Sequence, residues 1–206
     1  MPLVRDEAEF EAKRQLIMQG ALKVFAERGF ERATNKAIAE AAGIGSPGLI
    51  YHYFKDKGDL LIQAVSSQSP DIRLLLKHDQ QLFDLPLEQF VQHVARTMVG
   101  MWSKPELIPV FKVMLGEALR NKDIVDILVS QGPGVLFRHL YHYFALQIER
   151  GAMRPMDPGV AVRSFLGPLL AYLFTREVID ILPPLDAEVM LQQGLELFLR
   201  GVKADT

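Results

Sequence analysis

TNKAIAEAAGIGSPGLIYHYFKDK, which runs from Thr34 to Lys57, has the pattern of two short helices joined by a tight turn. Thr34 or Asn35 is suited to cap the first helix, because a short side-chain oxygen can accept from the free amides of a first turn. Gly43 follows the alanine-rich stretch at the position where a left-handed residue ends many helices. Ser46 repeats the capping pattern, and the proline after it suits a first helical position. The segment therefore predicts a helix, a turn and a second helix.

Small residues at the joint would let the two helices cross at a wide angle. Ala39, Ala41 and Ala42 precede the turn, so the backbones can approach closely there. The space between the helices would be filled by apolar residues at helical spacing: Ile38, Ile44, Ile50 and Tyr53. A helix pair of this kind places its second helix in the major groove of DNA.

At these residues the chain resembles the tetracycline-repressor (TetR) family of transcriptional regulators. The family's N-terminal domain has three helices, and the second and third form its helix-turn-helix. The resemblance covers roughly residues 10–62. It includes, outside the segment already quoted, Arg14, Ile17, Ala21, Phe25, Gly29, Phe30, Leu60 and Leu61, and within it Lys55 and Lys57. The implied fold is all-α, with a flexible arm at residues 1–10, a DNA-binding domain at 11–58 and a larger helical ligand-binding and dimerisation domain at 59–206.

The resemblance and the helix pattern together predict a set of DNA contacts. Thr34 and Lys36 lie at the start of the first motif helix, where free amides and a nearby cation favour a phosphate. Tyr51 and His52 are placed to donate to phosphate or to approach a base edge. Lys57 is expected to contact the DNA backbone from the start of the following helix.

Three further residues of the second motif helix, Ser46, Pro47 and Leu49, fall at or near family contact positions. The turn before them is one residue longer than the usual family spacing, which leaves their register open. Leu49 could contact a thymine methyl group or pack inside the protein. Tyr53 and Phe54 are expected in the core, because helical spacing from Ile50 turns them inward.

Charge supports this interpretation only locally. The chain of 206 residues has a formal net charge of −2, although neutralisation of phosphates is the main sequence-independent contribution to DNA affinity. Between Glu11 and Gly58, however, eight Lys and Arg face five Asp and Glu. The predicted DNA-binding domain is therefore the basic part of the chain. Scattered Lys and Arg on short helices are as often a solvated surface.

Proline and glycine divide the remaining sequence into helical segments. The expected helices are residues 57–81 with an interruption near residue 69, 86–103, 106–120, 121–150, 157–182 and 186–202. The sequence Gly132, Pro133, Gly134 either shortens the fourth of these or divides it in two. Asp157 and Asp186 are suited to cap the last two helices.

The last two helices carry more apolar surface than one small core needs. Their apolar residues are Val162, Phe165, Leu166, Leu169, Leu170, Leu173 and Phe174 on one helix, and Val189, Leu191, Leu195, Phe198 and Leu199 on the other. In the resembled family these helices pair with their counterparts in a dimer, which implies a homodimer on an inverted-repeat operator. The alternative is that they pack only within their own domain.

A set of aromatic and methionine side chains predicts a pocket for a small apolar or amphipathic effector. The predicted ligand-binding residues are His93, Met98, Trp102, Phe111, Met114, Phe137 and Tyr141. The sequence thus predicts a ligand-responsive regulator, a repressor released from a palindromic operator. The alternative function is an all-helical enzyme or a lipid- or small-molecule-binding protein that uses the C-terminal cavity, with structural N-terminal helices.

Composition narrows these possibilities further. Apolar residues make up 49% of the chain and cysteine is absent, which indicates a globular protein without disulfides or thiolate metal sites. His139 and His142 lack a carboxylate partner at matching spacing, so we expect no metal site and no cofactor. The sequence has no nucleophile elbow and no phosphate-binding glycine loop, so we expect no catalytic residues. It also lacks a signal-peptide pattern and a membrane-spanning run, and a cytoplasmic protein is expected.

Overall fold

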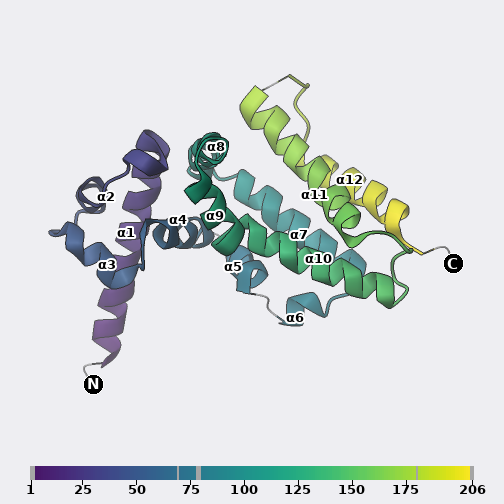
Figure 1. Ribbon diagram of the computed structural model, residues 1–206, viewed down its shortest axis with the longest axis horizontal. Helices are drawn as coiled ribbons and strands as arrows, with labels where there is room; N and C mark the ends of the chain where they lie inside the picture. Colours follow the sequence, from purple (N-terminus) through teal and green to yellow (C-terminus); the bar gives the residue numbers. More distant parts are fainter. Residues whose placement is uncertain (1–2, 69, 78–79, 180, 205–206) are drawn as a thin grey trace. The chain divides into compact units, whose positions relative to one another are not determined.

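A computed structural model describes residues 3–68, 70–77, 80–179 and 181–204, and these residues form helices without a β-strand (Figure 1). The all-α prediction is confirmed. The chain folds into two compact units. The first unit contains the residues up to Gln68 together with Lys104–Gln131, and the second contains Ser69–Ser103 and the residues from Gly132 onward.

The first unit is built on one long helical segment, which is interrupted near its end by Gly29 with φ 80° and ψ 170°. Its elements are α1 (Leu3–Arg32), α2 (Asn35–Ala42), a 3₁₀ turn (Pro47–Leu49), α3 (Ile50–Tyr53), α4 (Lys57–Ser66), α8 (Leu107–Ala118) and α9 (Lys122–Gln131). One face of α1 is fully covered, and its buried residues include Ile17, Met18, Ala21 and Phe25. An amphipathic helix of this kind is stabilised mainly by the packing of that face.

The predicted caps of the helix-turn-helix are largely confirmed. The Thr34 hydroxyl accepts a hydrogen bond from the Ala37 amide at 3.2 Å, and Gly43 adopts the left-handed conformation with φ 67°. Ser46 occupies the cap position before Pro47 but makes no side-chain cap hydrogen bond. The second motif helix therefore starts as a 3₁₀ turn and becomes α-helical only at Ile50.

The crossing of α1 and α2 depends on Gly20. A Cβ atom at this position would lie 2.7 Å from the backbone nitrogen of Ala42 and 2.9 Å from its Cβ. Only a hydrogen atom fits there, so the two backbones approach more closely than any other residue at position 20 would permit. This contact sets where α2 lies on α1.

The N-terminal boundary differs from the prediction. Residues 3–10, expected as part of a flexible arm, are the first turns of α1. They continue a helix whose next turns are anchored by buried side chains, and no proline between Leu3 and Arg32 breaks it.

The grouping of the helices also differs from the predicted division at residue 58. Helices α8 and α9 pack against α1 and α4, so they belong to the first unit. The contact is close at Gly58, where a Cβ atom would lie 2.8 Å from Ile127 Cδ1. The boundaries 11–58 and 59–206 remain a prediction about function. The packing groups the helices differently, because α8 and α9 belong to the first unit.

The second unit has an aromatic core. Its elements are α5 (Pro70–Lys77), α6 (Gln80–Phe83), α7 (Leu87–Trp102), α10 (Pro133–Glu149), α11 (Pro158–Phe174), a π-helical turn (Thr175–Ile179) and α12 (Ala187–Val202). Rings from five of these helices meet, namely Phe83, Phe90, Tyr143, Phe144, Phe165 and Phe198. Tyr143 stacks on Phe90 at 3.7 Å, its hydroxyl donates to the Leu85 carbonyl, and burial raises its pKa.

Several predicted helix ends of this unit are confirmed. Asp157 and Asp186 accept hydrogen bonds from the first amides of α11 and α12. The break at Gly132 separates α9 from α10, which decides between the two alternatives that the sequence left open. Helix α11 ends at Phe174 and continues only as the π-helical turn, earlier than the predicted residue 182. No described helix is long and apolar enough to cross a membrane.

Candidate DNA-binding face and effector domain

The second motif helix separates buried from exposed residues sharply. Ile50 and Phe54 are buried, whereas Tyr51 is 66% exposed and His52 is also exposed. Tyr53, expected in the core, is half-buried. An exposed tyrosine beside an exposed histidine, on a helix anchored by its apolar neighbours, can donate hydrogen bonds to an external partner.

The other predicted DNA contacts lie in the same part of the first unit. Thr34 and Lys36 are exposed at the start of α2, and Ser46 and Pro47 are exposed at the start of the 3₁₀ turn. Leu49 is half-buried, which leaves both of its predicted roles open. These positions remain predictions as DNA contacts.

Lys57 differs from the other predicted contacts, because its ammonium group is already engaged. Its Nζ donates to the carbonyl oxygens of Phe30, Glu31 and Ala33 at 2.7, 3.2 and 3.3 Å. Partial burial lowers the pKa of Lys57, and the nearby Glu31 and Glu117 oppose that effect. Three carbonyls use all three ammonium donors, so a phosphate contact would compete with the bonds at the end of α1.

The seven predicted ligand-binding residues do not come together in one described cavity. His93, Met98 and Trp102 lie on α7 and Phe137 and Tyr141 on α10, in the second unit. Phe111 and Met114 lie on α8, in the first unit. Trp102 is buried, while Phe137 and Tyr141 are 40% and 45% exposed. His93 stands out because its Nε2 is buried without a hydrogen-bond partner.

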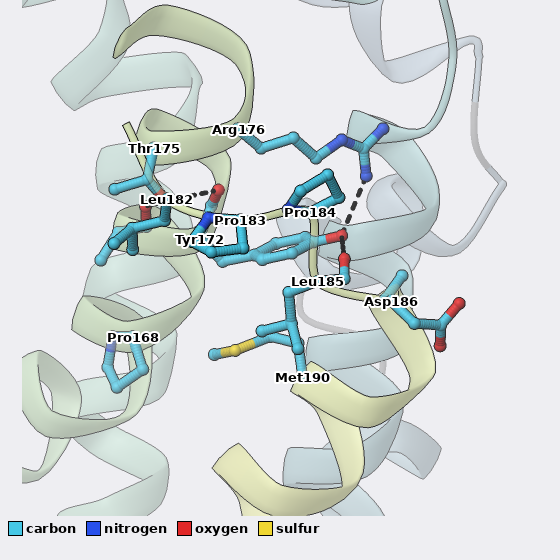
Figure 2. A pocket seen from close by; sticks show the side chains of 12 residues that line it. Pro168, Tyr172, Thr175, Arg176, Leu182, Pro183, Pro184, Leu185, Asp186 and Met190 are labelled. Carbon is cyan, nitrogen blue, oxygen red and sulfur yellow. Dashed lines mark hydrogen bonds between the residues drawn. The ribbon is translucent and has the colours of Figure 1, made fainter. Parts of the chain in front are cut away.

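A groove that the sequence did not predict lies along α11 and α12. One part, of about 790 Å³, is lined by Pro168, Tyr172, Leu185 and Met190 together with the Pro183–Pro184 loop (Figure 2). The Tyr172 hydroxyl donates to the Leu185 carbonyl at 3.2 Å, and Arg176 Nη1 donates to the Tyr172 oxygen at 3.0 Å. These bonds tie the loop to α11. A second part, of about 490 Å³, continues from Pro168, Leu185 and Met190 towards Gly201.

Exposed apolar residues extend along the same two helices. The apolar residues that suggested a dimer from the sequence are mostly core residues: Val162, Phe165, Leu166, Leu169, Leu173, Leu191 and Phe198 are buried. The exposed stripe shares only Phe174 with that set. It is formed by Val160, Ser164, Gly167, Ala171 and Phe174 on α11 and by Leu197 and Gly201 on α12, where the half-buried Met190 and Gly194 continue the same spacing. Its alternating spacing of four and three residues could have been found in the sequence, but small residues carry a weak hydrophobic signal.

Comparison with known proteins identifies both parts of the chain. Residues 17–64 match the family described as "Bacterial regulatory proteins, tetR family". Residues 89–201, more than half of the chain, match the "AefR-like transcriptional repressor, C-terminal domain". The chain belongs to the TetR family. The resemblance seen in the helix-turn-helix is confirmed, and this TetR-family protein is a DNA-binding transcriptional regulator.

Individual relatives of this TetR-family chain agree over nearly its whole length. It is 25% identical over 198 residues to the HTH-type transcriptional regulator YhgD of Bacillus subtilis, covering 94% of this chain and 98% of YhgD. The crystal structure of FadR from Bacillus subtilis in complex with stearoyl-CoA has a TM-score of 0.69 at 20% identity, covering 90% and 97% of the two chains. A SmeT–triclosan complex has a TM-score of 0.69 at 21% identity, covering 94% and 93%. These solved structures share the fold.

Proposed function

We propose that the protein is a homodimeric repressor that binds an inverted-repeat operator and is released by a small apolar or amphipathic effector. The observation that carries the proposal is the exposure of Tyr51 and His52 on a helix anchored by buried Ile50 and Phe54. Both side chains carry hydrogen-bond donors and face away from the core. A short helix displayed in this way fits the major groove.

The DNA contacts divide into two kinds. Thr34 and Lys36 bind phosphate and fix the register of the protein on the duplex, as expected for an exposed cation at a helix N-terminus. Tyr51 and His52, with Ser46, Pro47 and Leu49 ahead of them, face the base edges and the adjoining backbone. Direct sequence reading then rests on few polar side chains, because proline and leucine offer no side-chain donor.

The second copy of the chain pairs through α11 and α12. The exposed stripe on each helix repeats every four and three residues, the spacing that keeps a seam facing a partner helix. Leu197 is 74% exposed and Phe174 is 41% exposed, so apolar surface is left uncovered on the single chain. An added Cβ at Gly167 or Gly201 would meet nothing within 4 Å, which leaves room for a neighbouring helix. Twofold pairing of this face would form a four-helix interface.

The effector binds the second unit. Support comes from its aromatic interior, from the orphaned Nε2 of His93, and from the ligands of the two similar structures, stearoyl-CoA and triclosan. Both of those ligands carry extensive apolar surface. For release to occur, the effector must bind the arrangement with low operator affinity more tightly, because only a difference in affinity shifts the equilibrium.

Selection of bound duplexes from a random pool, followed by fluorescence anisotropy over a salt series, tests the proposal. We expect an inverted repeat bound by two chains, with affinity that falls steeply as salt rises. Candidate acyl-CoA and aryl effectors should then weaken the binding. An asymmetric site would contradict the dimer. An absence of salt-dependent binding would favour the rival function, a lipid-binding protein or enzyme with structural N-terminal helices.

A further inference from the structure

The first turns of α1 reach the recognition helix. The Phe10 ring lies 4.5 Å from the Tyr53 ring centre, tilted by 36°, and 6.1 Å from the His52 ring in an edge-on arrangement of 72°. His52 and Tyr53 are themselves edge-on at 5.5 Å. These three rings form a cluster in which Phe10 is the member from outside the helix-turn-helix.

The recognition helix needs support of this kind because it is short. It consists of the 3₁₀ turn Pro47–Leu49 and the four residues of α3, which the Phe54 amide closes by donating to the Ile50 carbonyl at 3.0 Å. A helix of this length is not stable through its own hydrogen bonds. Its orientation must therefore be set by side chains that pack on it from elsewhere.

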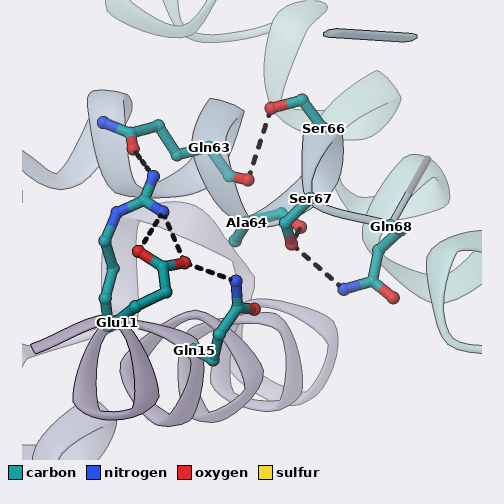
Figure 3. Close-up of polar contacts among 8 residues, drawn as sticks. Glu11, Gln15, Gln63, Ala64, Ser66, Ser67 and Gln68 are labelled. Atoms are coloured by element: carbon teal, nitrogen blue, oxygen red, sulfur yellow. Dashed lines mark hydrogen bonds and ion pairs between the residues drawn. The ribbon is translucent and has the colours of Figure 1, made fainter. Parts of the chain in front are cut away.

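Arg14 provides a second contact from α1, one turn beyond Phe10. Its guanidinium carbon lies 5.7 Å from the centre of the Phe54 ring. The guanidinium donates hydrogen bonds to Glu11 at 3.1 Å and to the Gln63 side chain. Figure 3 shows Glu11 on α1 and Gln63 on α4 on either side of these bonds. Phe10 and Arg14 lie four residues apart, on one face of the helix. Together they contact three successive residues, 52 to 54.

Phe10 is not part of the buried core. It is 41% exposed, whereas the core face of α1 starts at Ile17, which has no exposed surface. Its ring contacts in the structure are with His52 and Tyr53. Removing this ring would therefore affect the direction of His52 more than the packing of the unit.

We propose that Phe10 is a positioning residue for DNA binding, which holds the His52 imidazole in the direction that meets the duplex. The proposal rests on the proposed function, in which His52 contacts DNA. An edge-on ring pair has a preferred geometry that a merely apolar contact lacks. The helical start of α1 then contributes to DNA binding through His52, without a direct contact between Phe10 and DNA.

A double-mutant cycle in the full-length chain tests this role. Operator affinity is measured for the wild type, Phe10→Ala, His52→Ala and the double variant, with the duplex recovered from the random pool. We expect Phe10→Ala to weaken binding about threefold to tenfold, and the double variant to bind no more weakly than His52→Ala alone. The dependence of log affinity on log salt should stay unchanged, because Phe10 carries no charge.

Two further variants separate positioning from folding. Phe10→Tyr keeps the ring and should restore wild-type affinity. Leu16→Ala removes a comparably exposed apolar side chain from α1, at 47% exposure, and should change affinity by less than about twofold. Thermal melts establish that all variants fold. In the free protein, the imidazole proton shifts of His52 should move in Phe10→Ala and remain in place in Leu16→Ala.

Two results would overturn the proposal, provided that the wild type binds its operator. One is an unchanged operator affinity in Phe10→Ala, and the other is a loss of affinity in Phe10→Ala that adds fully to that of His52→Ala. A wild type that binds no duplex in a salt-dependent manner would instead overturn the proposed function, and the role of Phe10 with it. Unmoved His52 shifts in Phe10→Ala would contradict the positioning contact without reference to DNA.

Discussion

The ammonium nitrogen of Lys57 lies 2.7 Å from the carbonyl oxygen of Phe30 and 4.5 Å from the centre of the Phe30 ring. Two more carbonyls of the same chain turn, those of Glu31 and Ala33, accept from it as well. The last carbonyls of a helix lack partners within the helix, and a cation there is favourable. Lys57 therefore joins the start of α4 to the end of α1, directly ahead of the helix-turn-helix.

Substitution of Lys57 should separate stability from phosphate binding. Lys57→Ala leaves three carbonyls without their donor, and the bonds to two of them, those of Phe30 and Ala33, are partly buried, so we expect the free energy of unfolding to fall by about 1–3 kcal/mol. If Lys57 only joins the helices, the slope of log affinity against log salt stays unchanged. If it also binds phosphate, the magnitude of the slope falls by about 0.9.

Lys36→Ala and Lys55→Ala are the matched controls. Lys36 is exposed at the start of α2. Its loss should reduce the magnitude of the slope of log affinity against log salt, with little change in the free energy of unfolding. Lys55 is exposed two residues before Lys57, and its loss should change stability by less than about 0.5 kcal/mol. Denaturant melts and anisotropy at several salt concentrations measure both quantities.

Gly20→Ala should disturb the helix-turn-helix from outside it. The added Cβ would lie 2.7 Å from the Ala42 nitrogen, so α2 must move away from α1. We expect a destabilisation of about 1–3 kcal/mol, as for other overpacked sites, together with weaker operator binding.

Gly100→Ala on α7 is the control, because its Cβ would meet nothing within 4 Å. Alanine is the better helix former, so this variant should be as stable as the wild type or slightly more stable. Equal melting temperatures for the two variants would contradict the role of Gly20.

Leu197→Glu should disrupt the proposed dimer without unfolding the chain. Leu197 is 74% exposed on α12, so its loss removes little packing within the single chain, whereas a carboxylate in an apolar interface is costly. We expect sedimentation to shift towards the monomer and affinity for the inverted repeat to fall about tenfold or more. Leu119→Glu, at a position 82% exposed directly after α8, should leave the oligomeric state unchanged. A stable dimer in Leu197→Glu would place the interface elsewhere.

An ion pair between α7 and α12 should show in a pH titration. Arg96 donates two hydrogen bonds to the Glu188 carboxylate, at 2.8 and 3.0 Å, and these bonds are the main reason that the pKa of Glu188 lies below its ordinary value. The paired carboxylate therefore stabilises the fold above the ordinary glutamate pKa, and this stabilisation is lost as the pH falls through the lowered pKa.

Arg96→Gln should raise the pKa of Glu188 towards the ordinary value, as followed by NMR of the carboxyl carbon. Lys203→Gln is the control, because Lys203 pairs with Glu88 at 3.2 Å and not with Glu188. An unchanged pKa of Glu188 in Arg96→Gln would mean that the pair does not form in solution.

Local signals in the sequence were reliable because they act over one helical turn. The caps at Thr34, Asp157 and Asp186 and the left-handed Gly43 depend on residues within four positions of themselves. The break before Pro133 was visible for the same reason, although the sequence could not decide whether it ended one helix or divided two. The helical start of α1 at residues 3–10 was missed, because no local signal distinguishes it from a charged arm.

By itself, the sequence determined that this chain is helical, that it carries a helix-turn-helix between Thr34 and Lys57, and that it belongs with the TetR family. The tertiary structure alone decided which side chains are available for function. Lys57 is engaged by Phe30, and Phe10 meets His52 across 42 positions of sequence. The exposed stripe on α11 and α12 likewise became distinct only once the larger apolar residues were buried. Such contacts join residues far apart in the chain, and their geometry follows from how whole helices pack, which no pattern within a single helix contains.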